Sequence, residues 1–214
     1  MQYINSYLFS FILCVALSHA STHPALAGND PLNVHQFTLE NGLKVYFTPN
    51  HQAPEFYTEM VVRSGAKQEP RDATGLAHYL EHLMFKGTHE IGTMNFNSEE
   101  ALNQQVVELY EQRFKERNPE KRSELNKKID EISVQAAQFV VAGEMDRLMS
   151  ALGQKNMNAY TWYDETVYQV GLSKNRFEQW AKIEAQRFQH PALARTFQWE
   201  LETVYEEKNR GADD

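Results

Sequence analysis

The residues best suited to chemistry lie in the run His78-Tyr79-Leu80-Glu81-His82. On a helix, His78 and His82 are four residues apart, so their side chains lie one above the other and can hold a single ion. Neutral imidazole is a good ligand for a borderline-soft metal such as zinc. Glu81 projects about 100° away from His82 around the helix, so it can stay off the metal and still reach a water bound there. The run therefore predicts metal-assisted hydrolysis.

Two histidines on a partly apolar helix are more often surface or core residues, so a metal site needs a further ligand. A catalytic zinc site uses three protein ligands and leaves the fourth position to water. Glu200 and Glu207 are seven residues apart on a helix expected from about Thr196, and they face the same way. A carboxylate of this helix is therefore the candidate third ligand. Glu206 is an alternative to Glu207, but it points about 100° away from Glu207, so both cannot reach one ion.

Several elements must position these groups. The two histidines are expected in a helix between Gly75 and Gly87, with Thr74 as its N-cap. Asn41-Gly42 lies between two β-rich runs and predicts a hairpin. Further strands are expected at 56–63 and 162–170. The pattern predicts a sheet with a helix packed on one face.

Residues 98–148 have a different character. The chain is charged and helical in pattern from Ser98 to Arg117 and again from Glu120 to Val141, and Asn118-Pro119 separates the two segments. We interpret them as a helical hairpin with a charged outer face that serves as a structural flap or spacer. A surface for a specific partner is the alternative.

The composition is that of a globular domain, because 42% of the 214 residues are hydrophobic and 23% are charged. The net charge of −8 argues against a nucleic-acid partner and leaves peptide substrates open.

Residues 1–27 are predicted to be an export signal, with an apolar run from Tyr7 to Leu17 that is too short to span a bilayer. Cleavage is expected after Ala20 or Ala27, although no Lys or Arg precedes the run, and an uncleaved membrane anchor is the alternative. The sole cysteine, Cys14, lies in this segment, so the mature chain would have neither a disulfide nor a thiolate zinc ligand. We expect a periplasmic or secreted protein that contacts a membrane only through an uncleaved signal.

Four blocks of the sequence resemble the M16 metallopeptidases, the family of pitrilysin, insulin-degrading enzyme and mitochondrial processing peptidase. The His-x-x-Glu-His order is that of the inverzincins. The blocks occur in the family's order, at 39–43, 75–88, 158–161 and 200–209. The resemblance implies an α+β fold in which helices pack on one face of a mixed β-sheet. Residues 28–214 would be part of the N-terminal peptidase domain, with 98–148 as an insertion.

The resemblance also implies roles for single residues. One zinc ion per chain would be held by His78, His82 and Glu207, and Glu200 would support the site by orienting a histidine. Glu81 would be the general base in a zinc-dependent endopeptidase. The substrate, a peptide or unfolded polypeptide, would pair as an extended strand with the segment Asn158, Ala159 and Tyr160.

Two departures from the family pattern shape the expected function. The interval between His82 and Glu207 is longer than usual, which the 98–148 insertion explains. The family encloses its substrate with a second, similar half that this sequence lacks. The chain is therefore expected to be a fragment, or a subunit that needs a C-terminal half or partner subunit for activity. A non-catalytic binding or assembly subunit of the same fold is the alternative.

Overall fold

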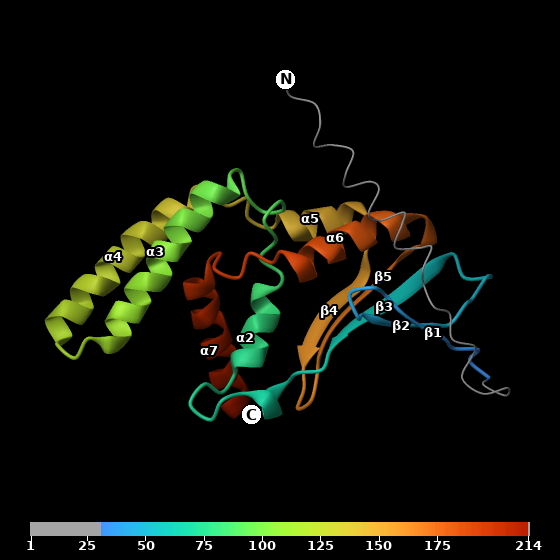
Figure 1. Ribbon diagram of the computed structural model, residues 1–214, viewed down its shortest axis with the longest axis horizontal. Helices are drawn as coiled ribbons and strands as arrows, with labels where there is room; N and C mark the ends of the chain where they lie inside the picture. Colours follow the sequence, from blue (N-terminus) through green and yellow to red (C-terminus); the bar gives the residue numbers. More distant parts are fainter. Residues whose placement is uncertain (1–30, 214) are drawn as a thin grey trace, which may run out of the picture. The chain divides into compact units, whose positions relative to one another are not determined.

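The computed structural model describes residues 31–213, with side chains described up to residue 210. The predicted export signal therefore lies outside the described residues. The chain divides into two compact units, the first ending at Pro54 and the second beginning at Glu55. The elements, shown in Figure 1, follow in the order β1 (His35–Thr38), β2 (Lys44–Phe47), β3 (Glu55–Val62), η1 (Ala66–Gln68), α2 (Leu76–Leu83), α3 (Phe96–Lys115), α4 (Pro119–Ala137), α5 (Glu144–Ala151), β4 (Lys155–Thr161), β5 (Thr166–Ser173), η2 (Lys174–Arg176), α6 (Phe177–Gln189) and α7 (Phe197–Asp213).

The first unit contains the hairpin predicted at Asn41-Gly42. Strands β1 and β2 pair in antiparallel fashion, with His35 opposite Phe47. Gly42 has a φ of 88°, a left-handed conformation that glycine adopts without steric cost. The Asn41 side chain accepts a hydrogen bond from the Leu43 amide at 3.1 Å, which fixes the turn. The turn prediction is confirmed.

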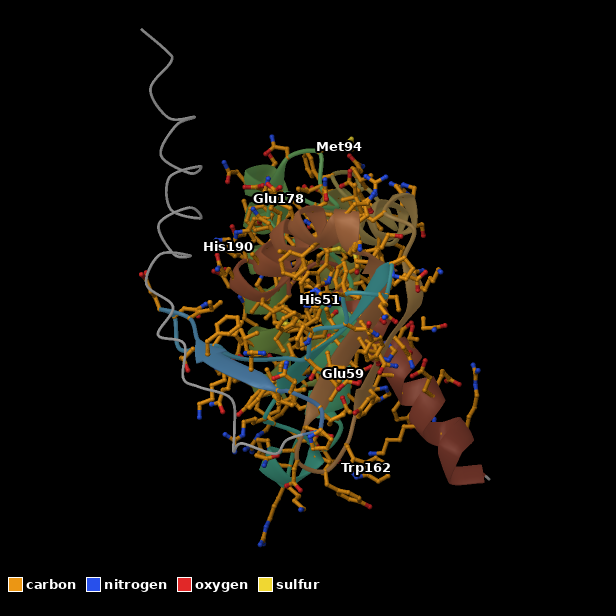
Figure 2. All side chains as sticks on the ribbon, turned by 90° about the vertical axis from the view of Figure 1, so that its right-hand side faces the viewer. His51, Glu59, Met94, Trp162, Glu178 and His190 are labelled. Carbon is orange, nitrogen blue, oxygen red and sulfur yellow. The ribbon has the colours of Figure 1, made fainter. Side chains whose placement is uncertain are left out.

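The second unit is built on a three-stranded sheet in the order β3-β5-β4. The central strand β5 runs antiparallel to both neighbours and is buried along most of its length. The predicted strand at 162–170 begins later, at Thr166, because Trp162 and Glu165 close a turn in which the Trp162 amide donates to the Glu165 carbonyl at 2.8 Å. Figure 2 shows Trp162 at this turn, at the opposite end of the view from Met94.

The predicted α+β class is confirmed, with helices and a sheet in separate stretches of the second unit. The expected mixed sheet differs in one respect. Within residues 31–213, all three strand pairings are antiparallel. The β4–β5 pairing follows from a short turn, and short turns can join only antiparallel strands.

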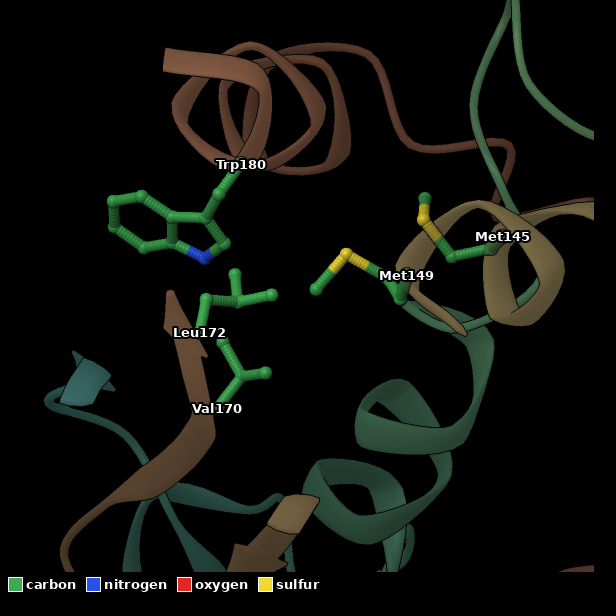
Figure 3. Close-up of a cluster of buried hydrophobic side chains, with 5 residues drawn as sticks. All are labelled: Met145, Met149, Val170, Leu172 and Trp180. Atoms are coloured by element: carbon green, nitrogen blue, oxygen red, sulfur yellow. The ribbon is translucent and has the colours of Figure 1, made fainter. Parts of the chain in front are cut away.

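The apolar core of the second unit lies between the sheet and two helices. Val170 and Leu172 from β5 meet Met145 and Met149 from α5 and Trp180 from α6, as Figure 3 shows. Leu172 is completely buried, and the other four side chains are at most 9% exposed. Their burial removes apolar surface from water and fixes α5 and α6 on the sheet.

Helices α3 and α4 form an antiparallel hairpin, in agreement with the pattern of residues 98–148. Asn118 is the N-cap of α4 and accepts a hydrogen bond from the Lys121 amide at 2.9 Å, and Pro119 occupies the first helical position, where its missing N–H costs nothing. The status of the hairpin as an insertion stays a prediction. Within residues 31–213, no helix has the length and apolar character needed to cross a membrane.

A buried arginine joins the loop after α2, the start of α3 and the segment before α7. Arg195 is 1% exposed, and two of its N–H groups donate to the carboxylate of Glu99 at 2.7 and 3.0 Å. The other three N–H groups donate to the backbone carbonyls of Lys86, Thr88 and Ile91 at 2.9, 3.0 and 2.8 Å. All five guanidinium donors are therefore satisfied away from water.

Glu99→Ala is expected to lower the free energy of unfolding by about 3–5 kcal/mol, because it leaves the buried Arg195 charge without a counter-charge. Urea denaturation of the metal-free chain measures this change. The control is Glu178→Ala, which removes one partner of the exposed pair with Lys182 and should change the free energy far less. If the two substitutions lowered the free energy of unfolding equally, the buried pair would stabilise the fold no more than the exposed pair does.

Candidate metal centre

The helix that carries both histidines starts from an acidic cap. Helix α2 spans Leu76–Leu83, shorter than the helix predicted between Gly75 and Gly87, and begins after Gly75, which has a φ of 92°. The carboxylate of Glu69 accepts hydrogen bonds from the amides of Gly75 and Ala77, both at 2.8 Å. The prediction of Thr74 as N-cap is therefore wrong. A carboxylate at this position satisfies amides that lack helical partners and also interacts favourably with the helix dipole.

Helix α7 brings a carboxylate to the two histidines. His78, His82 and Glu207 each offer a ligand atom, and these atoms lie within 4.8 Å of one another. The two Nε2 atoms are 3.1 Å apart, and the Oε2 of Glu207 is 3.6 Å from Nε2 of His78 and 3.4 Å from Nε2 of His82. Within the part of the chain that the structure describes, it is the sole group of three or more such residues, and Glu206 does not belong to it.

These separations fit a tetrahedral zinc ion. Bonds of about 2.0–2.1 Å at tetrahedral angles place neighbouring ligand atoms about 3.3 Å apart. The three observed distances, 3.1, 3.4 and 3.6 Å, bracket that value. The side chains of His78 and Glu207 are 38% and 44% exposed, so water reaches the cluster. Two imidazoles and one carboxylate with an accessible fourth position are the donor set of a catalytic zinc site.

Glu200 lies behind His82, on the side away from the cluster. Its Oε1 is 2.7 Å from Nδ1 of His82, and its Oε2 forms an ion pair with Lys86. When Nδ1 carries the proton, it donates to Glu200 and leaves Nε2 free to bind a metal. The structure thus brings Glu200 beside one of the two histidines.

The electrostatics favour an ionised Glu200. Desolvation raises its pKa, but the hydrogen bonds from Lys86 and His82 outweigh that effect, and the pKa lies below its ordinary value. A lowered pKa in the folded state stabilises the fold above the unfolded-state pKa, and this contribution is lost as the pH falls through the folded-state pKa. At neutral pH Glu200 is therefore a charged acceptor for His82.

Glu81, which precedes His82 on α2, is held by the sheet. It is 7% exposed, and its Oε2 accepts a hydrogen bond from Oγ1 of Thr161 at 2.6 Å. Thr161 Oγ1 is also 3.5 Å from Oγ1 of Thr166, which donates to the Ser64 carbonyl at 2.9 Å. The carboxylate of Glu81 is therefore held by the end of β4.

Two supporting residues were missed in the sequence. Thr161 ends the block 158–161, and Lys86 follows His82 by four residues but lies beyond the end of α2 at Leu83. Helical spacing therefore does not predict the ion pair of Lys86 with Glu200. The contact between Thr161 and Glu81 joins residues 80 positions apart, and no local pattern reveals it.

The segment predicted to bind substrate lies on an edge strand. Asn158, Ala159 and Tyr160 belong to β4, which pairs with β5 along one edge, and among the described strands none pairs with its other edge. Asn158 and Tyr160 are exposed. Helix α2 lies beside β4 in the second unit (Figure 1), so the edge strand and the histidine-bearing helix are neighbours.

Known proteins are similar to this chain in sequence. Residues 44–106, which include both histidines and Glu81, match the family model described as insulinase, peptidase family M16. A probable mitochondrial-processing peptidase subunit beta from Arabidopsis thaliana is 36% identical over 76 residues, which are 34% of this chain and 14% of that protein. A probable zinc protease PqqL from Escherichia coli is 27% identical over 135 residues, 63% of this chain and 10% of that protein.

A solved structure shares the fold. The crystal structure of the periplasmic protease PqqL from Escherichia coli matches with a TM-score of 0.57 and 21% identity, over 89% of this chain and 16% of that chain. The chain therefore spans a small part of the length of the proteins it matches. The family model and these relatives show that this chain is similar to the N-terminal part of M16 peptidases, and the solved structure shows the same fold.

Proposed function

We propose that this chain carries the zinc site of a zinc-dependent endopeptidase, with one zinc ion per chain. The observation that supports the proposal best is the convergence of His78, His82 and Glu207, whose ligand atoms are separated as tetrahedral zinc requires. The relatives add support, because PqqL is described as a probable zinc protease.

The protein groups around the site have separate tasks. Bound zinc would polarise a peptide carbonyl and make a water molecule more acidic. Glu81 would accept the proton from that water and pass it to the leaving amine, and the Thr161 hydroxyl would hold the carboxylate in one orientation. Glu200 would keep the Nδ1 proton on His82, so that Nε2 faces the metal.

The substrate would be an extended peptide. The outer edge of β4 offers backbone donors and acceptors at Asn158, Ala159 and Tyr160. Pairing of this kind binds main chain and makes little demand on sequence. The proposed substrates are therefore peptides or unfolded polypeptides rather than folded proteins.

A second peptidase half would complete the enclosure of the substrate. This part of the proposal is supported by the small share of each relative that the chain covers, 14% and 10% of the two named above. The half could come from the same polypeptide or from a partner subunit. Export to the periplasm is proposed from the likeness to PqqL, whose solved structure is described as that of a periplasmic protease.

The test is a cleavage assay with a quenched fluorescent peptide library, applied to the chain alone and to the chain linked to a C-terminal M16 half. We expect cleavage by the linked form that stops when zinc is removed by a chelator and returns when zinc is restored. Stoichiometric zinc binding without cleavage in either form would contradict the endopeptidase and fit a non-catalytic subunit. Absence of zinc binding would contradict the metal site itself.

Glu200→Gln is expected to weaken zinc binding by about 10–100-fold, because an amide cannot supply the charge that holds the His82 proton on Nδ1. Competition with a chromophoric chelator measures the dissociation constant. Glu202→Gln on the same helix is the control, since Glu202 is exposed and lies outside the cluster. If both variants and the unmodified chain had the same zinc dissociation constant, Glu200 would have no role in zinc binding.

A further inference from the structure

The helical hairpin contacts the chain where α7 begins, and α7 carries both carboxylates of the metal centre. We propose that hairpin α3–α4 positions α7, and so sets the place of Glu207 at the zinc site. This inference rests on the proposed zinc function. It gives a role in the site to a part of the chain that contributes no ligand.

Beyond its first turn, helix α7 buries few of its own side chains. Between Leu201 and Arg210, Val204 is the one buried residue, and the other nine are exposed. Tyr79 of α2 donates from its hydroxyl to the Phe197 carbonyl at 2.6 Å, which again holds the start of the helix. Helix α7 packs against α2, and the contacts near residue 197 fix the start of α7.

The hairpin supplies several of those contacts. On α4, Asp130 accepts a hydrogen bond from Nε2 of Gln198 at 2.9 Å, and Ser133 donates to Oε1 of the same side chain at 3.2 Å. On α3, the ring of Tyr110 meets that of Phe197 edge to face, with centroids 5.3 Å apart. Both ends of the Gln198 amide and the neighbouring ring are thus fixed by the hairpin.

The backbone just before α7 also needs external support. Thr196 has a φ of 54°, a left-handed conformation that is unfavourable for a β-branched residue. Such a residue stays in place only when its surroundings hold it. It stands between Arg195, which binds Glu99 of α3, and the Phe197 and Gln198 contacts. The hairpin therefore holds this junction from both sides.

The geometry of a helix magnifies small changes at its start. Glu207 lies nine residues beyond Gln198, which is a rise of about 13 Å along α7. A tilt of about 10° at the start would move Glu207 by about 2 Å, whereas zinc–ligand distances tolerate only about 0.2 Å. Glu200 is two residues from Gln198 and would move much less. The hairpin contacts should therefore matter for Glu207 in particular.

The experiment uses the full chain with Asp130→Ala and Ser133→Ala combined, which removes both partners of Gln198 without touching α7. We expect zinc binding to weaken by about 10–100-fold, the range known for residues that orient a ligand. The visible spectrum of the cobalt-loaded chain should lose intensity as the third ligand withdraws. Glu131→Ala, an exposed change on the same helix, is the matched control and should alter neither measurement.

A background that lacks the third ligand separates positioning from general loss of structure. In Glu207→Ala chains, the two α4 changes should have no further effect on the remaining affinity, because the carboxylate they position is gone. An equal loss in both backgrounds would overturn the inference, and so would affinity equal to that of Glu131→Ala. If the unmodified chain bound no zinc, the proposed function itself would be wrong. That result differs from normal zinc binding that the α4 changes leave unaffected, which would contradict only the role of the hairpin.

Discussion

Glu207→Ala is expected to weaken zinc binding by more than about 100-fold, because loss of a direct ligand should exceed the cost of losing a residue that only orients one. The two histidines would remain as neighbours on α2, with their Nε2 atoms 3.1 Å apart, but the third protein ligand would be missing. Titration against a competing chelator measures the affinity, and metal analysis gives the zinc content per chain.

Glu206→Ala is the control for this prediction, since it changes the neighbouring residue of the same helix. Glu206 lies outside the cluster, so its removal should change the affinity by no more than about twofold. If Glu206→Ala removed zinc and Glu207→Ala retained it, the ligand assignment would be reversed.

Glu81→Gln is expected to lower kcat by about 10²–10⁴-fold in a form of the protein that cleaves peptides, with zinc affinity unchanged. The amide has almost the same shape and can still accept the Thr161 hydrogen bond, but it cannot take a proton from water. Steady-state cleavage of a fluorescent peptide provides kcat, and chelator competition provides the zinc affinity.

The comparison for Glu81→Gln is Glu90→Gln, an exposed carboxylate in the loop after α2 that should leave both quantities unchanged. Cleavage by Glu81→Gln at the rate of the unmodified protein would mean that another group accepts the proton. A loss of zinc together with activity would mean that Glu81 supports the metal site rather than the proton transfer.

The local parts of this fold could be predicted because they depend on neighbouring residues. Asn41-Gly42 specifies a tight turn, and Asn118-Pro119 separates two helices by its own capping chemistry. The pairing of His78 with His82 follows from helical spacing alone.

The parts that could not be predicted depend on side chains that no local pattern identifies. The cap of α2 comes from Glu69, six residues before the amide of Gly75, and it replaces the predicted Thr74. The buried Arg195 collects carbonyls more than 100 residues earlier in the chain, which no periodicity could indicate.

In the candidate site, too, local spacing could be predicted, whereas the contacts between helices could not. Spacing placed Glu200 and Glu207 on one side of a helix but left Glu206 as an alternative ligand, because the direction of that side depends on how α7 lies against α2. In the structure, Glu200 meets His82 and Glu207 lies near both histidines. This placement supports Glu207, rather than Glu206, as the proposed third ligand.

The central claim is that two imidazoles and the Glu207 carboxylate bind one divalent ion. X-ray absorption at the zinc edge of the chain loaded with one equivalent of zinc tests it most directly. The account predicts four-coordinate zinc with two imidazole nitrogens at about 2.0–2.1 Å and a carboxylate oxygen at about 2.0–2.2 Å, the oxygen being lost in Glu207→Ala. A first shell without imidazole scattering, or one unchanged by Glu207→Ala, would contradict it.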